Sequence, residues 1–283
     1  MSETPRAISG LGDIAAAYDV LLIDQFGVLH DGHKPYPGVV DCLTRAAALG
    51  KRSIVLTNSG KRAAPNAERL VRLGFPRTAF ASVVSSGEVG WHAIRDGTFG
   101  APFLHGARVH VIGRQGDDYG LDGISLEPTD MPETAECLLI LGSDVPRTSL
   151  DVYRAQLAAA AAAGIPALCA NPDRQMITEH GLAPAPGAIA AVYEELGGKV
   201  TYVGKPHAAI YRYALASAPE APRDRVLAIG DSVEHDIAGA TALGITTLLI
   251  RGGILADKSD AELAALYAQH AATPAYIAPS LIW

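Results

Sequence analysis

Several acidic, hydroxyl and basic side chains follow short apolar segments of this sequence, in an order that suits phosphate chemistry. The candidates are Asp24 after VLLI, Thr57 and Asn58 after IVL, Lys205 after TYVG, and Asp231 after VLAIG, with Asp236 five residues further on. In an open parallel sheet, ligands bind beyond the carboxyl ends of the strands, so residues that are distant in sequence can meet there. We therefore expect these side chains to converge.

A carboxylate that attacks a phosphate dianion needs positive charge beside it. Asp24 and Asp231 could hold a Mg²⁺ that offsets the repulsion, and Lys205 would add a second positive charge. Thr57 and Asn58 are the candidate phosphate-binding residues, helped by backbone N–H groups at the start of the next helix. Asp24 would then attack phosphorus in line and form an aspartyl-phosphate that water hydrolyses.

The stretch GDSVEHDIAGA carries the strongest single pattern. Gly230 permits a tight turn after the strand, and Asp231 and Asp236 are spaced to bracket the first helical turn. Asp231 is the predicted metal ligand. Asp236 is predicted to support the metal site, although a carboxylate at a helix start also favours the helix dipole without any metal.

The elements that must position these residues alternate along the chain. Apolar segments rich in β-branched residues predict strands at 20–23, 53–56, 109–112, 138–141, 167–169, 200–203, 226–229 and 246–250. Ala-rich periodic segments between them predict helices at 38–49, 64–73, 149–163, 187–196, 207–218 and 234–243. This alternation is typical of an α/β fold with helices on both faces of a Rossmann-like, doubly wound parallel sheet.

Two stretches read as paired linkers around a middle segment. They are the residues 84–87 and the Pro- and Gly-rich LAPAPG at 182–187. We therefore expect a discontinuous core domain of residues 1–85 and 182–283, with an inserted α/β domain of residues 86–181.

Composition narrows the function classes. The chain has 283 residues, 49% apolar residues and a formal net charge of −7, without the Lys and Arg run that a nucleic-acid partner would need. Three separated cysteines suggest neither a disulfide framework nor a zinc site. The N-terminus lacks the pattern of a signal peptide, and no apolar run is long enough for a bilayer. We expect a cytoplasmic protein without a membrane or nucleic-acid partner.

Four stretches together resemble the haloacid dehalogenase-like hydrolases. They are LLIDQFGVLHDG, IVLTNSG, VGKP and GDSVEHDIAGA, and ALCANPD resembles the segment by which one subclass, IIA, leaves its large α/β cap. That subclass includes bacterial nucleotide and sugar phosphatases of the NagD type. The resemblance runs from about Val20 to Trp283 and implies a Mg²⁺-dependent hydrolase of small phosphorylated metabolites. It also implies that residues 86–181 are the cap, whose surface could form a homodimer.

One position departs from the family pattern. The residue two after the nucleophile is usually a second Asp, which protonates the leaving oxygen and later activates water, while its backbone carbonyl binds Mg²⁺. Here that residue is Phe26, which keeps the carbonyl and lacks the carboxyl group. General acid–base catalysis is typically worth about 10²–10⁴-fold in rate.

Two interpretations follow from this departure. The protein is a phosphatase that favours good leaving groups or recruits a surrogate, for which His30 and Asp31 are the near candidates. Alternatively, it binds or senses phosphorylated ligands without turning them over. His30 and Asp31 also read as an ordinary solvated turn with Gly32.

Specificity should lie in the inserted domain, if it covers the site. Arg174 and Gln175, just after Asn171-Pro172-Asp173, are the candidates for substrate contacts there. Aromatic content is low, at 6%, so no base-stacking pocket is indicated, and a sugar phosphate, a nucleotide or a cofactor phosphate all remain open.

Two other classes fit less well. A phosphate-receiving signalling module would end within roughly half this length, and its acidic pair would precede the nucleophile, whereas Asp231 lies far downstream of Asp24. A dinucleotide site at Gly10, Gly12 and Ala15 would need a preceding strand, and this run comes before the first clear one.

Overall fold

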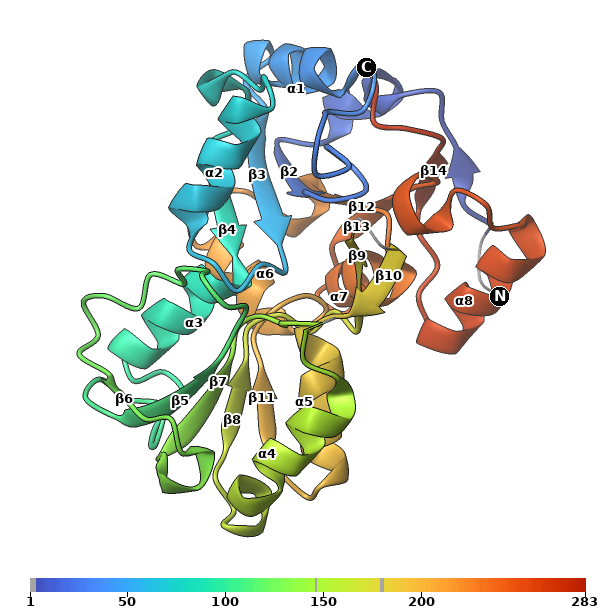
Figure 1. Ribbon diagram of the computed structural model, residues 1–283. Helices are drawn as coiled ribbons and strands as arrows, with labels where there is room; N and C mark the ends of the chain where they lie inside the picture. The colour runs from blue at the N-terminus through green and yellow to red at the C-terminus, as the bar shows by residue number, and fades with distance from the viewer. Residues whose placement is uncertain (1–3, 146, 179–180) are drawn as a thin grey trace. The chain divides into compact units, whose positions relative to one another are not determined.

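The computed structural model describes residues 4–145, 147–178 and 181–283, and these form two compact units (Figure 1). The first unit contains Met1–Thr57, Ala64–Val84 and Lys205–Trp283, and the second contains Asn58–Ala63 and Ser85–Gly204. The second unit thus extends past residue 181, where the sequence placed the end of the insertion. The reason is that the segment after residue 181 adds a helix and an edge strand to the second unit's own sheet.

The first unit is built on a seven-stranded sheet in the order β1-β14-β13-β12-β2-β3-β4. The pairs from β1 to β3 are all parallel. The strands are β1 Arg6–Ala7, β2 Val20–Asp24, β3 Arg52–Thr57, β4 Ser82–Ser85, β12 Val226–Gly230, β13 Thr246–Ile250 and β14 Tyr276–Ala278. Because β2 lies between β12 and β3, the ends of three motif-bearing strands are neighbours.

Helices cover both faces of this sheet, as its strand sequences require. Alternate residues of β13 show it, since Leu248 and Ile250 join one hydrophobic cluster and Leu249 joins another. A strand buried on both faces is apolar throughout, and β2 is buried along its whole length. The helices are α1 Val39–Ala48, α2 Ala63–Arg72, α6 Ala208–Leu215, α7 Ala238–Thr241 and α8 Asp260–His270.

Short 3₁₀ turns connect these elements. They are η1 Leu11–Asp13, η2 Ala15–Ala17, η3 Arg77–Ala79, η5 Arg223–Arg225 and η7 Gly253–Leu255. The last helix, α8, begins at a capping box in which Ser259 and Glu262 satisfy each other's backbone N–H groups.

The second unit has a five-stranded parallel sheet in the order β11-β8-β7-β5-β6. Its strands are β5 Arg108–Ile112, β6 Glu127–Pro128, β7 Cys137–Ile140, β8 Ala167–Cys169 and β11 Val200–Tyr202, with a separate antiparallel hairpin of β9 Gln175–Thr178 and β10 Gly181–Pro184. Its helices are α3 Ser86–Arg95, α4 Leu150–Ala162 and α5 Pro186–Glu195, and a 3₁₀ turn, η4, spans Pro132–Thr134. α4 and α5 pack with β7 and β8 around one apolar core.

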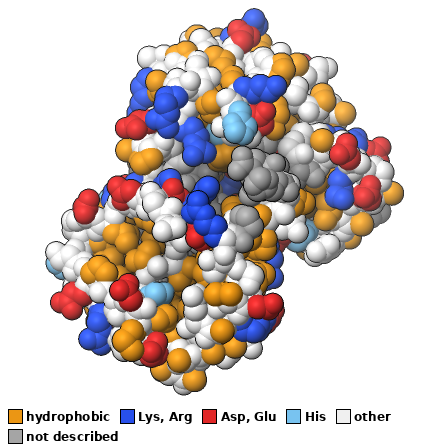
Figure 2. All heavy atoms as spheres, viewed as in Figure 1, with side chains coloured by type: hydrophobic (Ala, Val, Ile, Leu, Met, Phe, Trp, Pro, Cys, Tyr) orange, Lys and Arg blue, Asp and Glu red, His pale blue; other side chains and the backbone are white. Residues whose placement is uncertain are grey.

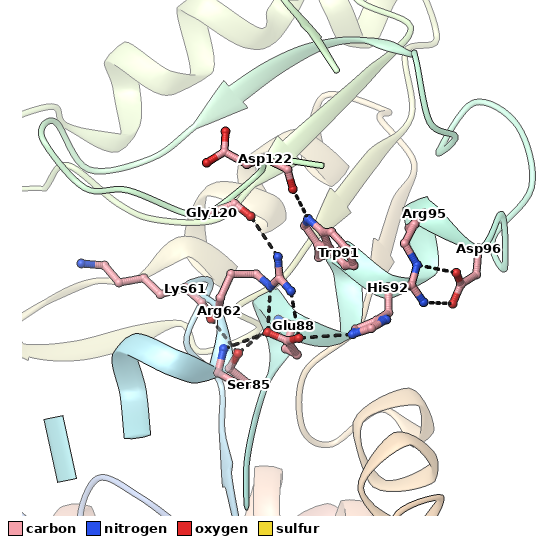
Figure 3. Close-up of polar contacts among 11 residues, drawn as sticks. Lys61, Arg62, Ser85, Glu88, Trp91, His92, Arg95, Asp96, Gly120 and Asp122 are labelled. Carbon is pink, nitrogen blue, oxygen red and sulfur yellow. Dashed lines mark hydrogen bonds and ion pairs between the residues drawn. The ribbon is translucent and has the colours of Figure 1, made fainter. Parts of the chain in front are cut away.

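The segment 58–63 is held to the second unit by an ion-pair network (Figure 3). Arg62 pairs with Glu88 through two hydrogen bonds of 2.7 and 2.9 Å, donates to the carbonyl of Gly120, and lies 4.0 Å over the Trp91 ring. Glu88 also accepts the N–H of Ala63, the first residue of α2. A carboxylate at a helix N-terminus is favourable, so this one side chain neutralises Arg62 and caps α2.

The α/β class predicted from the sequence is confirmed. Each predicted strand lies on or within one or two residues of an observed strand. The strands β1, β4, β6, β9, β10 and β14 and the helices α3 and α8 were not predicted. Basic and acidic side chains are interspersed over the face that Figure 2 shows. None of the described helices has the length and apolarity to cross a membrane.

Candidate active site

Three adjacent strand ends bring the predicted reactive residues together. β2 ends at Asp24, and its neighbours β12 and β3 lead to Asp231 and Thr57. The register pairs Ile229 with Ile23, so the two aspartates leave their strands at nearly the same level. All three polar side chains are buried.

Three carboxylates form a compact buried cluster at this edge. Oxygen atoms of Asp24, Asp231 and Asp236 all lie within 4.8 Å of one another. Lys205 donates hydrogen bonds to Asp24 and, at 2.7 Å, to Asp236. The Lys205 side chain is 4% exposed, so these are charge-assisted bonds in a region of low dielectric. The ammonium group donates to two of the three clustered carboxylates, so carboxylates outnumber it within this cluster.

The arrangement of these charges shifts the pKa values of Asp24 and Lys205. Burial raises the pKa of Asp24, Lys205 opposes the change, and the carboxylate of Asp236 adds to it, so the pKa lies well above the usual range. Burial lowers the pKa of Lys205, but Asp236 and Asp24 outweigh it and the pKa is raised, so the lysine stays charged. A bound cation would keep the cluster ionised.

The donor set fits a hard divalent cation. Oxygen ligands from carboxylates, with a backbone carbonyl as a further ligand, are what Mg²⁺ prefers. Asp24, Asp231 and the backbone carbonyl of Phe26 are the residues predicted to hold it, with Asp236 in support. Three buried carboxylates around a single ammonium group give such an ion the charge that it needs.

A π-helical turn positions the Asp236 side chain. After β12, Ser232 begins the turn Val233–Ile237 by accepting the N–H of His235, and its own N–H donates to Asp236 at 3.1 Å. Gly230 leaves the space that Asp236 occupies, because a Cβ there would lie 2.1 Å from the carboxyl carbon. π-helical turns are rare and often occur at functional sites.

Two glycines enclose Asp231, and sequence reasoning missed both. A Cβ on Gly27 would lie 1.9 Å from Oδ2 of Asp231, and one on Gly253 would lie 1.8 Å from the same atom. Both have positive φ, which side chains rarely tolerate. The signals in the sequence were the Phe26-Gly27 step and the Gly252-Gly253 pair after β13. The backbone of the loop after Asp24 therefore packs directly on the predicted metal ligand.

The Phe26 side chain lies on the surface of this loop. It is 43% exposed, its ring meets the His30 ring edge-on with centroids 4.5 Å apart, and the Arg69 guanidinium lies 5.4 Å from its centre. Aromatic and cation–π contacts of this kind each contribute about 0.5–1.5 kcal/mol. The ring thus has partners of its own within the first unit.

His30 and Asp31 serve the loop's own structure. His30 is fully buried, and its Nδ1 accepts the N–H of Gly32 at 2.9 Å. Its Nε2 lies 3.0 Å from Nε2 of Gln25, and Oε1 of Gln25 has no partner among the described residues. With the amide turned over, an Nε2–H of His30 would donate to that oxygen and satisfy both groups. Burial and Arg69 lower the pKa of His30 to about 4, against the opposite effect of Asp31.

The exposed Asp31 carboxylate accepts the N–H groups of His33 and Lys34, each at 2.9 Å. These two hydrogen bonds lower its pKa, against a small effect of burial. This is the pattern of an Asx turn, in which the carboxylate acts as an acceptor.

Asn58 contacts the second unit's residues with its side chain. Its Nδ2 donates to Asp173 at 2.8 Å, and its Oδ1 accepts from Ser86 at 3.3 Å. Asp173 belongs to the predicted ALCANPD stretch. Arg174 and Gln175 follow it and are exposed, with Gln175 opening the hairpin β9.

Known proteins resemble this chain in sequence and in fold. A model of the family described as haloacid dehalogenase-like hydrolase matches residues 21–126, and a second, HAD-hydrolase-like, matches residues 202–283. The structure of glycerol phosphate phosphatase Rv1692 from Mycobacterium tuberculosis, in complex with magnesium, is 30% identical with a TM-score of 0.73, over 93% of this chain and 75% of that one. This chain belongs to the haloacid dehalogenase-like hydrolases.

Two more relatives agree with that assignment. D-glycerol 3-phosphate phosphatase of Mycobacterium tuberculosis is 29% identical over 95% of this chain and 71% of its own length. A haloacid dehalogenase-like hydrolase from Brucella suis has a TM-score of 0.83 at 28% identity, over 97% of this chain and all of that one. The predicted family, subclass IIA, and the predicted class of phosphatase-type hydrolase are confirmed.

Proposed function

We propose that this chain hydrolyses phosphate monoesters of small metabolites with Mg²⁺, through an aspartyl-phosphate at Asp24. The observation that carries the proposal is the buried cluster in which one lysine faces three carboxylates. Carboxylates this close together repel one another, and a cation between them would offset that repulsion. The phosphatase relatives and the magnesium complex of one of them support the same reading.

Each residue then has a defined part. Asp24, Asp231 and the Phe26 carbonyl would hold Mg²⁺, which neutralises phosphate charge and orients one of its oxygens. Lys205 holds Asp24 in place through their hydrogen bond and adds positive charge beside the phosphate. The Thr57 hydroxyl and the Asn58 backbone N–H are the donors for the remaining phosphate oxygens. Asp236 fixes the ammonium group of Lys205 from the other side.

The reaction has two displacements. An Asp24 carboxylate oxygen bonds to phosphorus as the ester oxygen leaves with its electron pair, and water then attacks the same phosphorus and returns the carboxylate. Glycerol 3-phosphate is one substrate to test, because relatives carry that activity in their names.

The test measures phosphate release from a panel of monoesters with Mg²⁺, beside an Asp24→Asn control. The panel contains p-nitrophenyl phosphate, acetyl phosphate and glycerol 3-phosphate. Release that disappears in Asp24→Asn and on chelation of Mg²⁺ supports the proposal.

Phe26 favours a second candidate, a protein that binds or senses phosphorylated ligands without turnover. An aromatic ring stands where the family usually has a carboxyl group, and that ring is packed against His30 and Arg69. If no ester is hydrolysed while Mg²⁺ and inorganic phosphate still bind by calorimetry, this candidate replaces the phosphatase.

The remaining expectations belong to this proposal. The partner is a small phosphorylated metabolite, the site of action is the cytoplasm, and the second unit offers a surface for a homodimer. Cell fractionation and analytical ultracentrifugation test the last two.

A further inference from the structure

The loop after Asp24 contains the side chains nearest in sequence that could give a proton to a departing oxygen. Phe26 has none to give. His30 is enclosed, with Nδ1 occupied by the Gly32 N–H and Nε2 by the Gln25 amide. Asp31 accepts two backbone N–H groups, which a carboxylate does best when it is ionised. The loop thus presents no free acid in these three positions.

The buried cluster offers no substitute. Lys205 and Asp236 are the charged groups that act on the Asp24 carboxylate, and they are hydrogen-bonded to each other. Lys205 already donates to two carboxylates, so giving a proton to a leaving group would remove the positive charge that holds Asp24 and Asp236. The hydrogen bonds of the cluster hold the lysine and the carboxylates in their ionised forms, so none of these groups serves as a proton donor to a leaving group.

We propose that the substrates of this site are phosphate compounds whose leaving group departs unprotonated, such as acyl, enol and aryl phosphates. This inference rests on the proposed function and narrows it. Alkyl monoesters, which include glycerol and sugar phosphates, release alkoxides that need a proton in the transition state. Without general acid catalysis they lose about 10²–10⁴-fold in rate.

The first step balances without an acid. The Asp24 oxygen forms a bond to phosphorus, the bond from phosphorus to the leaving oxygen breaks, and its electron pair stays on that oxygen. The leaving group departs as a carboxylate, enolate or phenolate. In the second step water bonds to phosphorus, the electron pair of the aspartyl–phosphate bond returns to Asp24, and the water proton passes to the released phosphate or to solvent.

The second step lacks a base for the same reason that the first lacks an acid. For an activated substrate, hydrolysis of the aspartyl-phosphate therefore becomes the slower step. We expect a burst of leaving group, about one per active site, before steady turnover.

The deciding experiment is the dependence of kcat/KM on the pKa of the leaving group. A series of substituted phenyl phosphates, with glycerol 3-phosphate as the alkyl member and acetyl phosphate as the acyl member, is measured on the unaltered protein with Mg²⁺. The expected result is a steep fall of kcat/KM as the leaving-group pKa rises. A flat dependence, or glycerol 3-phosphate hydrolysed as fast as the activated esters, overturns the proposal.

Variants at Phe26 test whether this residue causes the dependence of kcat/KM on leaving-group pKa. Phe26→Asp should flatten the dependence and raise kcat/KM for glycerol 3-phosphate by about 10²-fold or more. Phe26→Leu, which keeps an apolar side chain, should keep the steep dependence. If Phe26→Asp folds and the dependence of kcat/KM on leaving-group pKa is unchanged, the missing acid is not explained by position 26. The result on the unaltered protein does not depend on whether this variant folds.

Two other loop residues serve as controls, His33 and Tyr36, because both carry protic side chains. His33→Ala and Tyr36→Phe should leave the slope unchanged. A steeper slope in either variant identifies that residue as the acid and overturns the proposal. If the unaltered protein releases phosphate from no member of the series, the proposed function fails, and that outcome is distinct from a flat slope.

Discussion

Two clusters of charged side chains in this protein differ in how their charges are paired. One surrounds Lys205, and the other contains Arg62 and Glu88. In the first unit, Lys205 faces the carboxylates of Asp24, Asp231 and Asp236, and charge is left over. In the second unit, the Glu88 carboxylate accepts two hydrogen bonds from Arg62 and lies 3.2 Å from Nε2 of His92, with the Trp91 face against the guanidinium (Figure 3).

The difference separates a reactive site from a structural one. The Arg62 guanidinium and the Glu88 carboxylate carry opposite charges, and both also hydrogen-bond to the backbone. In the Lys205 cluster, three carboxylates lie close to one ammonium group, and the cation that we propose would offset their mutual repulsion. Unbalanced buried charge is therefore the better marker of function, whereas a balanced pair, however well formed, holds segments together.

The sharpest contrast between the clusters comes from Asp24→Asn. Activity on p-nitrophenyl phosphate should fall by roughly 10⁴-fold or more, because the attacking oxygen is lost. The melting temperature without metal should stay the same or rise, since one of three crowded carboxylates becomes neutral. Calorimetry and phosphate release measure the two effects. A large loss of stability would show that Asp24 is mainly structural.

Metal addition should stabilise the protein through the first cluster alone. Mg²⁺ at 100 times its dissociation constant raises the free energy of unfolding by about 2.7 kcal/mol if it binds only the folded state. Asp231→Asn should remove most of this gain, and Glu88→Gln should leave it intact. Thermal unfolding with and without Mg²⁺ measures it. An equal gain in Asp231→Asn would place the ion elsewhere.

Breaking the second cluster should cost stability. Glu88→Gln leaves the Arg62 guanidinium without its counter-charge, with side chains only 23% and 15% exposed. We expect a loss of about 2 kcal/mol in the free energy of urea unfolding. Asp96→Asn is the matched control, because the Arg95–Asp96 pair is 42% and 50% exposed and should contribute little to stability. Equal losses in both variants would contradict the distinction.

The smallest expected effect is the pH dependence of the stability that Glu88 contributes. Burial opposes ionisation of Glu88, but the hydrogen bonds from Arg62 and from the Ala63 N–H outweigh it and lower its pKa from 4.5 to about 2. A carboxylate with a lowered folded-state pKa stabilises the fold above its unfolded pKa and loses that contribution as pH falls. The difference in stability between the unaltered protein and Glu88→Gln should therefore be constant above about pH 4.5 and shrink toward pH 2. Urea unfolding across this range tests it.

The fold class was predictable because local pattern carries it. Apolar strands such as VLLI and VLAIG, and the Ala-rich helices between them, are visible at the level of a few residues. The missed strands are short, whereas the missed helices α3 and α8 are of ordinary length. β14 is a three-residue strand, α3 begins within the stretch taken as a linker, and the turn before α7 is π-helical.

The end of the insertion shows a second limit. LAPAPG has the composition of a linker, yet its residues form β10 and the start of α5. Pairing of β11 with β8 then assigns the following segment to the second unit. Strand partners depend on residues far away in the chain, so composition alone could not place this boundary.

By itself, the sequence determined which side chains stand at the strand ends and in which order, and these carried both the family and the predicted chemistry. Only the tertiary structure decided which groups these side chains contact and hydrogen-bond. It buried His30, turned the Asn58 amide toward Asp173, and enclosed Asp231 between Gly27 and Gly253. The physical reason is that residue types follow from a local pattern, whereas burial, charge balance and proton availability arise from packing between segments that are distant in the chain.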